Sequence, residues 1–108
     1  MGPTGPIIQA NLNHSVRAQD LFVQFLAERG AGLAVAAEPY RVPDHPHWMG
    51  DLDGSAVIIW AGRPGSPACS VIERGRGYLA VDWGGTVVVA IYAPPRWSLE
   101  EYEQYLDV

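Results

Sequence analysis

Short apolar runs, four to seven residues long and separated by turns rich in glycine and proline, limit what this chain can fold into. Runs of this length suit β-strands, and a single stretch instead repeats its apolar residues with helical spacing. That stretch forms one stripe of an amphipathic helix through Ala18, Leu21, Phe22, Phe25 and Leu26. A strand, a helix, a second strand and then several more strands, in this order, predict an α/β layered fold.

Hydrophobic runs, capping residues and prolines predict where the strands and the helix begin and end. Strands are expected at residues 7–12, 33–37, 56–60, 70–73, 78–83 and 86–92. Residues 13–15 offer N-cap chemistry for the helix, and Gly30 ends it. Proline disfavours helical geometry in the residue before it, so Glu38, which precedes Pro39, is expected to be extended.

The chain beyond residue 39 is expected to form a loop and then hairpins. Residues 40–54 predict the loop, while residues 74–77 and the Gly84-Gly85 pair predict tight hairpin turns. The run at residues 86–92 is apolar on both faces, which predicts a central, covered strand. Residues 98–101 match a capping box that would begin a final helix.

Length and composition restrict the classes of function. With 108 residues, 48% hydrophobic and 18% charged, the chain has room for one folded domain, expected over residues 7–108 behind a loose arm at residues 1–6. No apolar run is long enough to cross a membrane, so no membrane partner is expected. Cys69 is the only cysteine, which excludes an intramolecular disulfide and favours an intracellular location. A net charge of −5 without any lysine counts against nucleic-acid binding by a broad basic surface.

Three of the predicted strands end in a polar side chain. Asn11, Glu38 and Tyr92 each close an apolar run, and ligands in layered α/β folds gather where strands end. If the three strands share a sheet and a direction, these side chains converge. A carboxylate can hold a hard divalent cation, and an amide and a phenol can hydrogen-bond phosphate oxygens. The set suits metal-assisted phosphodiester hydrolysis, although polar strand ends are also common in purely structural positions.

Six segments, in order along the chain, carry a family resemblance. Residues 8–15, 33–40 and 91–95 resemble the first three motifs of the endonuclease/exonuclease/phosphatase superfamily. A second set resembles the apurinic/apyrimidinic-like endonuclease domain of arthropod non-LTR retrotransposons, at residues 42–46, 50–54 and 73–78. The resemblance implies the N-terminal half of such a domain, that is, a partial four-layer α/β/β/α sandwich.

The same resemblance implies a role for each strand-end residue. Asn11 resembles the asparagine of the family's phosphate and metal network, Glu38 its metal-binding glutamate, and Tyr92 the tyrosine that helps to hold the scissile phosphate. The implied function is Mg²⁺- or Mn²⁺-dependent nicking of target DNA during retrotransposition, by a parent protein that also carries a reverse transcriptase. An active enzyme of this kind would work in the nucleus.

Two further motifs of the family have no counterpart here. The chain has no Asp-x-Asn motif and no Asp-His pair after Tyr92, which the family uses to polarise water and to stabilise the leaving group. We therefore expect an inactive, truncated form whose partner would be the missing C-terminal half of the domain. Two other functions stay open: a non-catalytic interaction module that retains the scaffold, and a phosphoesterase of the same superfamily.

Arginines are the candidate DNA contacts, because the chain has no lysine to meet phosphate. Arg41 follows Glu38 closely, and Arg74 and Arg76 lie in a predicted hairpin turn. An exposed surface charge explains Arg41 equally well, and a plain turn explains the other two.

Other polar and aromatic groups have a structural explanation that we favour. The acidic and histidine residues at positions 44–53 fit a solvated loop better than a metal cluster, with residues 51–54 as a turn. The tryptophans fit core packing better than base stacking. Nothing in the sequence near Cys69 would activate its thiol as a nucleophile.

Overall fold

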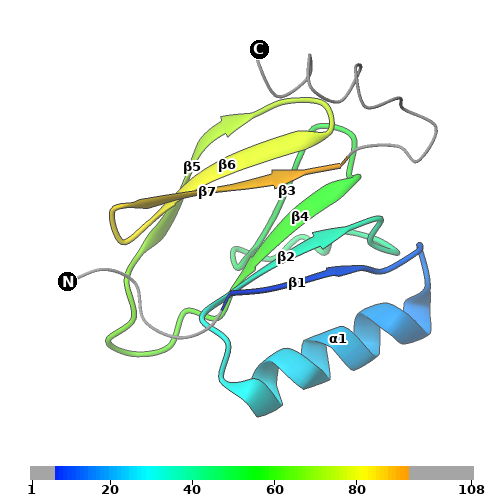
Figure 1. The fold of residues 1–108 in the computed structure, drawn as a ribbon, viewed down its shortest axis with the longest axis horizontal. Coiled ribbons are helices and arrows are strands. Elements are labelled where there is room, and N and C mark those ends of the chain that lie inside the picture. Colours follow the sequence, from blue (N-terminus) through cyan, green and yellow to red (C-terminus); the bar gives the residue numbers. More distant parts are fainter. Residues whose placement is uncertain (1–6, 93–108) are drawn as a thin grey trace.

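Two β-sheets and one helix make up residues 7–92, the part of the chain that the computed structural model describes. The first sheet has the strand order β1-β2-β4-β3, and the second has the order β5-β6-β7 (Figure 1). The first sheet contains β1 (Ile7–Asn11), β2 (Leu33–Ala37), β3 (Trp48–Gly50) and β4 (Ala56–Trp60). The second contains β5 (Cys69–Arg74), β6 (Tyr78–Trp83) and β7 (Thr86–Ile91), and the helix is α1 (Val16–Arg29).

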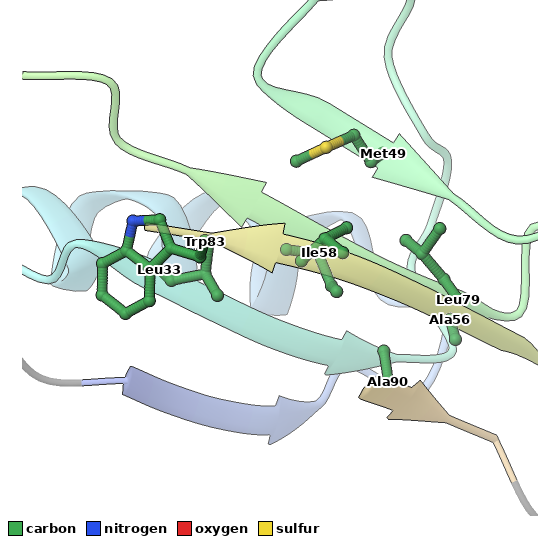
Figure 2. Packing of buried hydrophobic residues seen from close by; sticks show 8 residues of the cluster. Leu33, Met49, Ala56, Ile58, Leu79, Trp83 and Ala90 are labelled. Carbon is green, nitrogen blue, oxygen red and sulfur yellow. The ribbon is translucent and has the colours of Figure 1, made fainter. Parts of the chain in front are cut away.

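The helix packs on one face of the first sheet, and the second sheet packs on the other face. Alternate residues along a strand point to opposite faces, so β2 and β4 contribute to two separate cores. Between the sheets lie Leu33 and Ile58, together with Leu79 and Trp83 of the second sheet (Figure 2). Between the helix and the first sheet lie apolar side chains from the helix, from β2 and β4 and from the segments that join them, namely Leu12, Phe22, Leu26, Ala31, Ala34, Ala36 and Val57. The described residues therefore form three layers, α/β/β, and the predicted α/β fold class is confirmed.

The first strand and the second run parallel and are joined by α1. Asn11 pairs with Ala37 at the carboxyl ends of both strands. The helix begins as predicted, because the Ser15 hydroxyl accepts a hydrogen bond from the Ala18 N–H at 3.1 Å. It ends at Gly30, whose φ of 64° is the left-handed conformation that glycine adopts without strain. This connection fixes where the chain leaves β1 and where it returns in β2.

The predicted helix stripe is only partly correct. Phe22 and Leu26 are buried with Gln19, but Leu21 is 54% exposed and Phe25 is 39% exposed. The two exposed residues lie beside β1, which is one of the two edge strands of the sheet. They line an open groove of about 600 Å³ between β1 and α1. The buried face of α1 is therefore narrower than its apolar stripe.

Two strand predictions were also wrong. The strand predicted to be central is β7, which lies at an edge of the second sheet with Val87 61% exposed and Val89 48% exposed. The predicted loop at residues 40–54 contains the short strand β3, which pairs with β4. The hairpins across residues 74–77 and across Gly84-Gly85 are confirmed.

The predicted arm at residues 1–6 and the final helix predicted to begin with the capping box at residues 98–101 lie outside the described residues. Within residues 7–92, no helix is long and apolar enough to cross a membrane.

Candidate active site

The carboxyl ends of β1 and β2 bring Asn11 and Glu38 to the same end of the first sheet. Asn11 is the last residue of β1, and Glu38 follows Ala37, the last residue of β2. The backbone continues this pairing beyond the strands, since the Leu12 N–H donates to the Ala37 carbonyl at 2.9 Å and the His14 N–H donates to the Glu38 carbonyl at 2.7 Å. The turn after β1 is held locally, because the Asn11 side-chain oxygen accepts the Asn13 N–H at 2.8 Å.

Tyr92 reaches the same place from the second sheet. The condition set for convergence, that all three strands share one sheet, is not met, because β7 belongs to the sheet that packs across from β1 and β2. The predicted convergence of Tyr92 with Glu38 is nevertheless present: the Tyr92 hydroxyl donates to Glu38 Oε1 at 3.3 Å. The Tyr92 N–H donates to the Gly77 carbonyl at 2.8 Å, which fixes the backbone where β7 ends. A site is thus formed between the two sheets and not along one of them.

Glu38 has an unusual backbone conformation. Its φ is +51°, in the left-handed region, so the prediction that it is extended was wrong. Its backbone is held on both sides, because its N–H donates to the Ser55 carbonyl at 2.9 Å while its own carbonyl accepts from His14. A non-glycine residue in this region costs on the order of 1–3 kcal/mol, and such strain clusters at functional sites. Asn13 and His14 have φ values of 51° and 57°, so all three positive-φ residues other than glycine within residues 7–92 belong to this site.

His14 is a site residue that sequence reasoning did not select. Its Nδ1 lies 3.2 Å from the Pro39 carbonyl, and its Nε2 lies 3.7 Å from Glu38 Oε1. The His14 side chain is 64% exposed, whereas that of Glu38 is 18% exposed. The sequence offered His14 only as one of three candidate cap residues, and its contact with Glu38 depends on the pairing of β1 with β2.

Gln19 supports the segment that follows Glu38. It is buried in α1, and its side-chain oxygen accepts the Tyr40 N–H at 2.8 Å and the Arg41 N–H at 3.4 Å. Its amide nitrogen donates to the Arg41 carbonyl at 3.0 Å. One buried glutamine therefore satisfies three backbone groups of residues 40–41 and holds this loop against the helix.

Asp51 ties the two sheets together at the same end of the molecule. It is 8% exposed and accepts from the N–H groups of Ser55 at 2.8 Å, Ala56 at 3.2 Å and Gly77 at 2.6 Å. The Ser55 hydroxyl donates to it as well, at 2.8 Å. The turn predicted at residues 51–54 is confirmed. Because Ser55 holds the Glu38 N–H and Gly77 holds the Tyr92 N–H, this carboxylate links the backbones that carry both site residues.

The candidate DNA-contacting arginines lie on segments that adjoin this site. Arg74 ends β5, and Arg76 lies in the turn whose Gly77 binds Asp51 and Tyr92. Arg41 is exposed on the loop that Gln19 holds. The Arg76 side chain is 84% exposed and lies 3.8 Å from Asp53, an exposed ion pair of small energetic weight. All three arginines are therefore exposed on segments next to the site.

The donor set at this end fits a divalent cation in part. Glu38 supplies a carboxylate and Asn11 an amide, which are oxygen donors of the kind that hard cations take. Within residues 7–92, no cluster of three or more His, Cys, Asp or Glu side chains could hold a metal ion. A cation bound here would have to complete its shell with water or with oxygen atoms of a ligand. A pocket of about 310 Å³ between the sheets lies next to this end and is lined by Asn11, Ala37 and Ile91 among others, but Glu38 is not part of its lining.

Other candidate groups lie elsewhere or have structural roles. Cys69 pairs with Trp83 in the second sheet, and burial, reinforced by the Asp82 carboxylate, raises the pKa of its thiol. A raised pKa leaves less thiolate, which argues against a nucleophile. Trp83 is 1% exposed in the core between the sheets, which confirms the packing role predicted for it.

Comparisons with known proteins show a likeness in structure but not in sequence. No protein-family model matches the chain, and no curated protein matches it in sequence. Among solved structures, it is similar to the endonuclease domain of TRAS1, a telomere-specific non-LTR retrotransposon, with a TM-score of 0.68 and 21% sequence identity. The likeness covers 93% of this chain and 51% of that one, so the chain spans about half the length of the TRAS1 domain. At this identity the likeness establishes an endonuclease-like fold.

Proposed function

We propose that this chain forms part of a divalent-metal-dependent DNA endonuclease domain, of the kind that nicks target DNA for a non-LTR retrotransposon. The observation that carries the proposal is the hydrogen bond from Tyr92 to Glu38, which joins the two sheets beside the end of β1. The likeness in fold to the TRAS1 endonuclease domain supports the same assignment. The attribution to arthropod elements, inferred from loop segments, stays a prediction.

Each site residue has a chemical role in this proposal. Glu38 would bind Mg²⁺ or Mn²⁺ with help from the Asn11 amide, since carboxylate and amide oxygens suit such ions. When bound, the cation would neutralise charge on the phosphodiester and polarise its phosphorus–oxygen bonds. Tyr92 donates its one hydroxyl hydrogen to Glu38, and on binding DNA it would turn this hydrogen to a phosphate oxygen and so position it.

DNA would be held by arginines at the margin of the site. Arg41 is exposed on the loop that Gln19 holds, and Arg74 and Arg76 are exposed on the hairpin whose Gly77 is held by Asp51. Guanidinium groups bind phosphate oxygens and so offset, locally, the net charge of −5. We further propose that groups acting on water and on the leaving group come from residues outside this sequence, and that the chain alone does not cleave.

The test is plasmid nicking and DNA binding by the purified chain, with and without Mg²⁺ or Mn²⁺. The variants are Glu38→Ala and, as a matched control, Glu28→Ala on α1, where the exposed carboxylate accepts a hydrogen bond from Gln24. We expect the wild type to bind DNA more tightly when a divalent cation is present. Glu38→Ala should bind DNA equally with and without the cation, and Glu28→Ala should behave as the wild type does.

The possible results separate the parts of the proposal. Nicking by the wild type that Glu38→Ala abolishes would support the nuclease assignment and contradict the proposed incompleteness. A folded chain that neither nicks DNA nor binds it in a cation-dependent way would overturn the nuclease assignment.

A non-catalytic interaction module is the second candidate, and the open groove between β1 and α1 favours it. Ile7, Leu21 and Phe25 are exposed apolar residues on β1 and α1, and the groove between these elements measures about 600 Å³. Exposed apolar surface of this kind marks protein interaction sites. This function predicts that Glu38→Ala has no effect on binding to a partner, whereas Phe25→Ser weakens it. A small-phosphoester substrate screen tests the remaining phosphoesterase alternative.

A further inference from the structure

The outer edge of β1 has no strand beside it in the described part of the chain. β1 ends the first sheet on one side, and β3 ends it on the other (Figure 1). The Leu12 N–H points toward β2, because it donates to the Ala37 carbonyl at 2.9 Å. Backbone groups alternate in direction along a strand, so the N–H and C=O groups of Ile7, Gln9 and Asn11 point away from β2. These three residues therefore present unpaired backbone donors and acceptors along the edge.

β1 also lacks the features that protect a free strand edge. Natural proteins protect such edges with charged side chains, bulges or very short strands, because an unprotected edge pairs with other chains. Two other edge strands are protected in this way: β3 has only three residues, and β5 contains a bulge and ends in Glu73 and Arg74. In contrast, β1 contains neither a charged residue nor proline. The edge strand β7 is uncharged too, but of these two strands only β1 has a helix beside it.

The helix adds exposed apolar surface next to this edge. Leu21 and Phe25 of α1 are 54% and 39% exposed, and both line the groove of about 600 Å³ between α1 and β1. Ile7, at the start of β1, is 48% exposed. A free strand edge that lies beside exposed apolar side chains is a surface on which another polypeptide can both form hydrogen bonds and pack.

The charge of this surface favours a second copy of the same chain as the occupant. β1 has no charged residue, and the charges of α1 cancel, because the helix contains two arginines, one aspartate and one glutamate. The net charge of −5 therefore lies on other parts of the chain. Two copies that meet through β1 and α1 bring no net charge together, whereas contact through the remaining, acidic surface is opposed by repulsion.

We infer that β1 pairs with the β1 of a second copy, antiparallel and centred on Gln9. A two-fold axis at Gln9 sets Ile7 of each copy opposite Asn11 of the other copy. All the outward N–H and C=O groups of these three residues are then bonded, because each opposite pair exchanges two hydrogen bonds. One surface serves both copies, as in most symmetric dimers.

The same axis sets the two α1 helices antiparallel and side by side on one face of the joined sheet. Leu21 and Phe25 lie on either side of the middle of the helix (Val16–Arg29). In an antiparallel pair, Leu21 of one copy therefore faces Phe25 of the other, and the exposed apolar groove is covered. The pairing uses the backbone of Asn11 but neither Glu38 nor Tyr92, so its failure would leave the proposed nuclease function untouched.

The test is sedimentation equilibrium of the full chain, with Gln9→Lys as the main variant. Gln9 is exposed, so a lysine there is tolerated in the single chain, whereas in the dimer two lysines would lie directly opposite each other. Val87→Lys is the matched control, because Val87 is 61% exposed on β7, the other uncharged edge strand. Circular dichroism checks that each variant folds. Amide hydrogen exchange of the wild type locates the contact independently of any variant.

We expect a dimer with a dissociation constant in the micromolar range, which Gln9→Lys weakens at least about tenfold and Val87→Lys less than about twofold. The Gln9 amide should exchange at least about tenfold more slowly in the dimer, whereas the Ala10 amide, which points toward β2, should change less. A wild type that is monomeric at about 1 mM overturns the inference. A dimer in which the Gln9 amide gains no protection, or which only Val87→Lys dissociates, also overturns it, because another surface then joins the copies.

Discussion

Asp51 offers the most direct test of how the two sheets are joined at the candidate site. Replacing it with alanine removes the acceptor for four hydrogen bonds, from Ser55 twice and from Ala56 and Gly77 once each. Ser55 is half-buried and can turn to water, but Ala56 and Gly77 are buried and their N–H groups cannot. Each buried donor left without a partner costs about 1–3 kcal/mol. We therefore expect Asp51→Ala to lower the free energy of unfolding by about 4 kcal/mol.

The loss is large for a domain of this size, because such domains are stable by only about 5–15 kcal/mol. With a urea dependence of about 2 kcal/mol per molar, the midpoint of unfolding should fall by about 2 M. Fluorescence of Trp83, which is buried between the sheets, reports the transition. Asp53→Ala is the matched control, since Asp53 is exposed and lies 3.8 Å from the exposed Arg76. Equal midpoint shifts in the two variants would refute the role assigned to Asp51.

Three further predictions concern single residues away from that carboxylate. Gly75→Ala should lower stability by about 1–3 kcal/mol in urea unfolding, because its Cβ would lie 2.0 Å from the Tyr78 ring; unchanged stability would contradict this packing. Ser15→Ala should cost about 1 kcal/mol and lower the thermal midpoint followed by circular dichroism, because the helix loses its cap; an unchanged midpoint would show that the cap is dispensable. Burial and then Asp82 raise the pKa of the Cys69 thiol, so alkylation by iodoacetamide at about pH 8 should be slower than for a free thiol. Asp82→Asn should accelerate it, and a rate insensitive to pH would disprove the assignment.

Local sequence signals predicted the elements but not how they pair. The Ser15 cap, the Gly30 stop and the glycine turn at residues 84–85 are set by a few neighbouring residues, and all three are present as predicted. Which sheet a strand joins is decided by long-range packing. The run at residues 86–92 looked central because it is apolar throughout, yet it lies at an edge.

For the candidate site too, local sequence signals predicted the residues but not their conformation. Asn11, Glu38 and Tyr92 could be selected because each closes an apolar run, and the structure brings Tyr92 into contact with Glu38. The left-handed conformation of Glu38 could not be predicted, because it depends on bonds to His14 and Ser55, which are distant in the sequence. The signal before Pro39 pointed to an extended residue, and the long-range bonds overrode it.

The strained backbone of this site depends on contacts made by other residues. The left-handed φ values of Asn13, His14 and Glu38 are unfavourable, so other contacts must hold the segments that contain them. Those contacts come from polar side chains in the interior: Gln19 fixes the loop after Glu38, and Asp51 fixes the segments that bind the Glu38 and Tyr92 backbones. Because Glu38 and Tyr92 stand on different sheets, any change that loosens the packing between the sheets should also separate them. Stability and site geometry are therefore coupled in this fold, and variants that weaken the site without unfolding the chain should be found among the residues at the site itself.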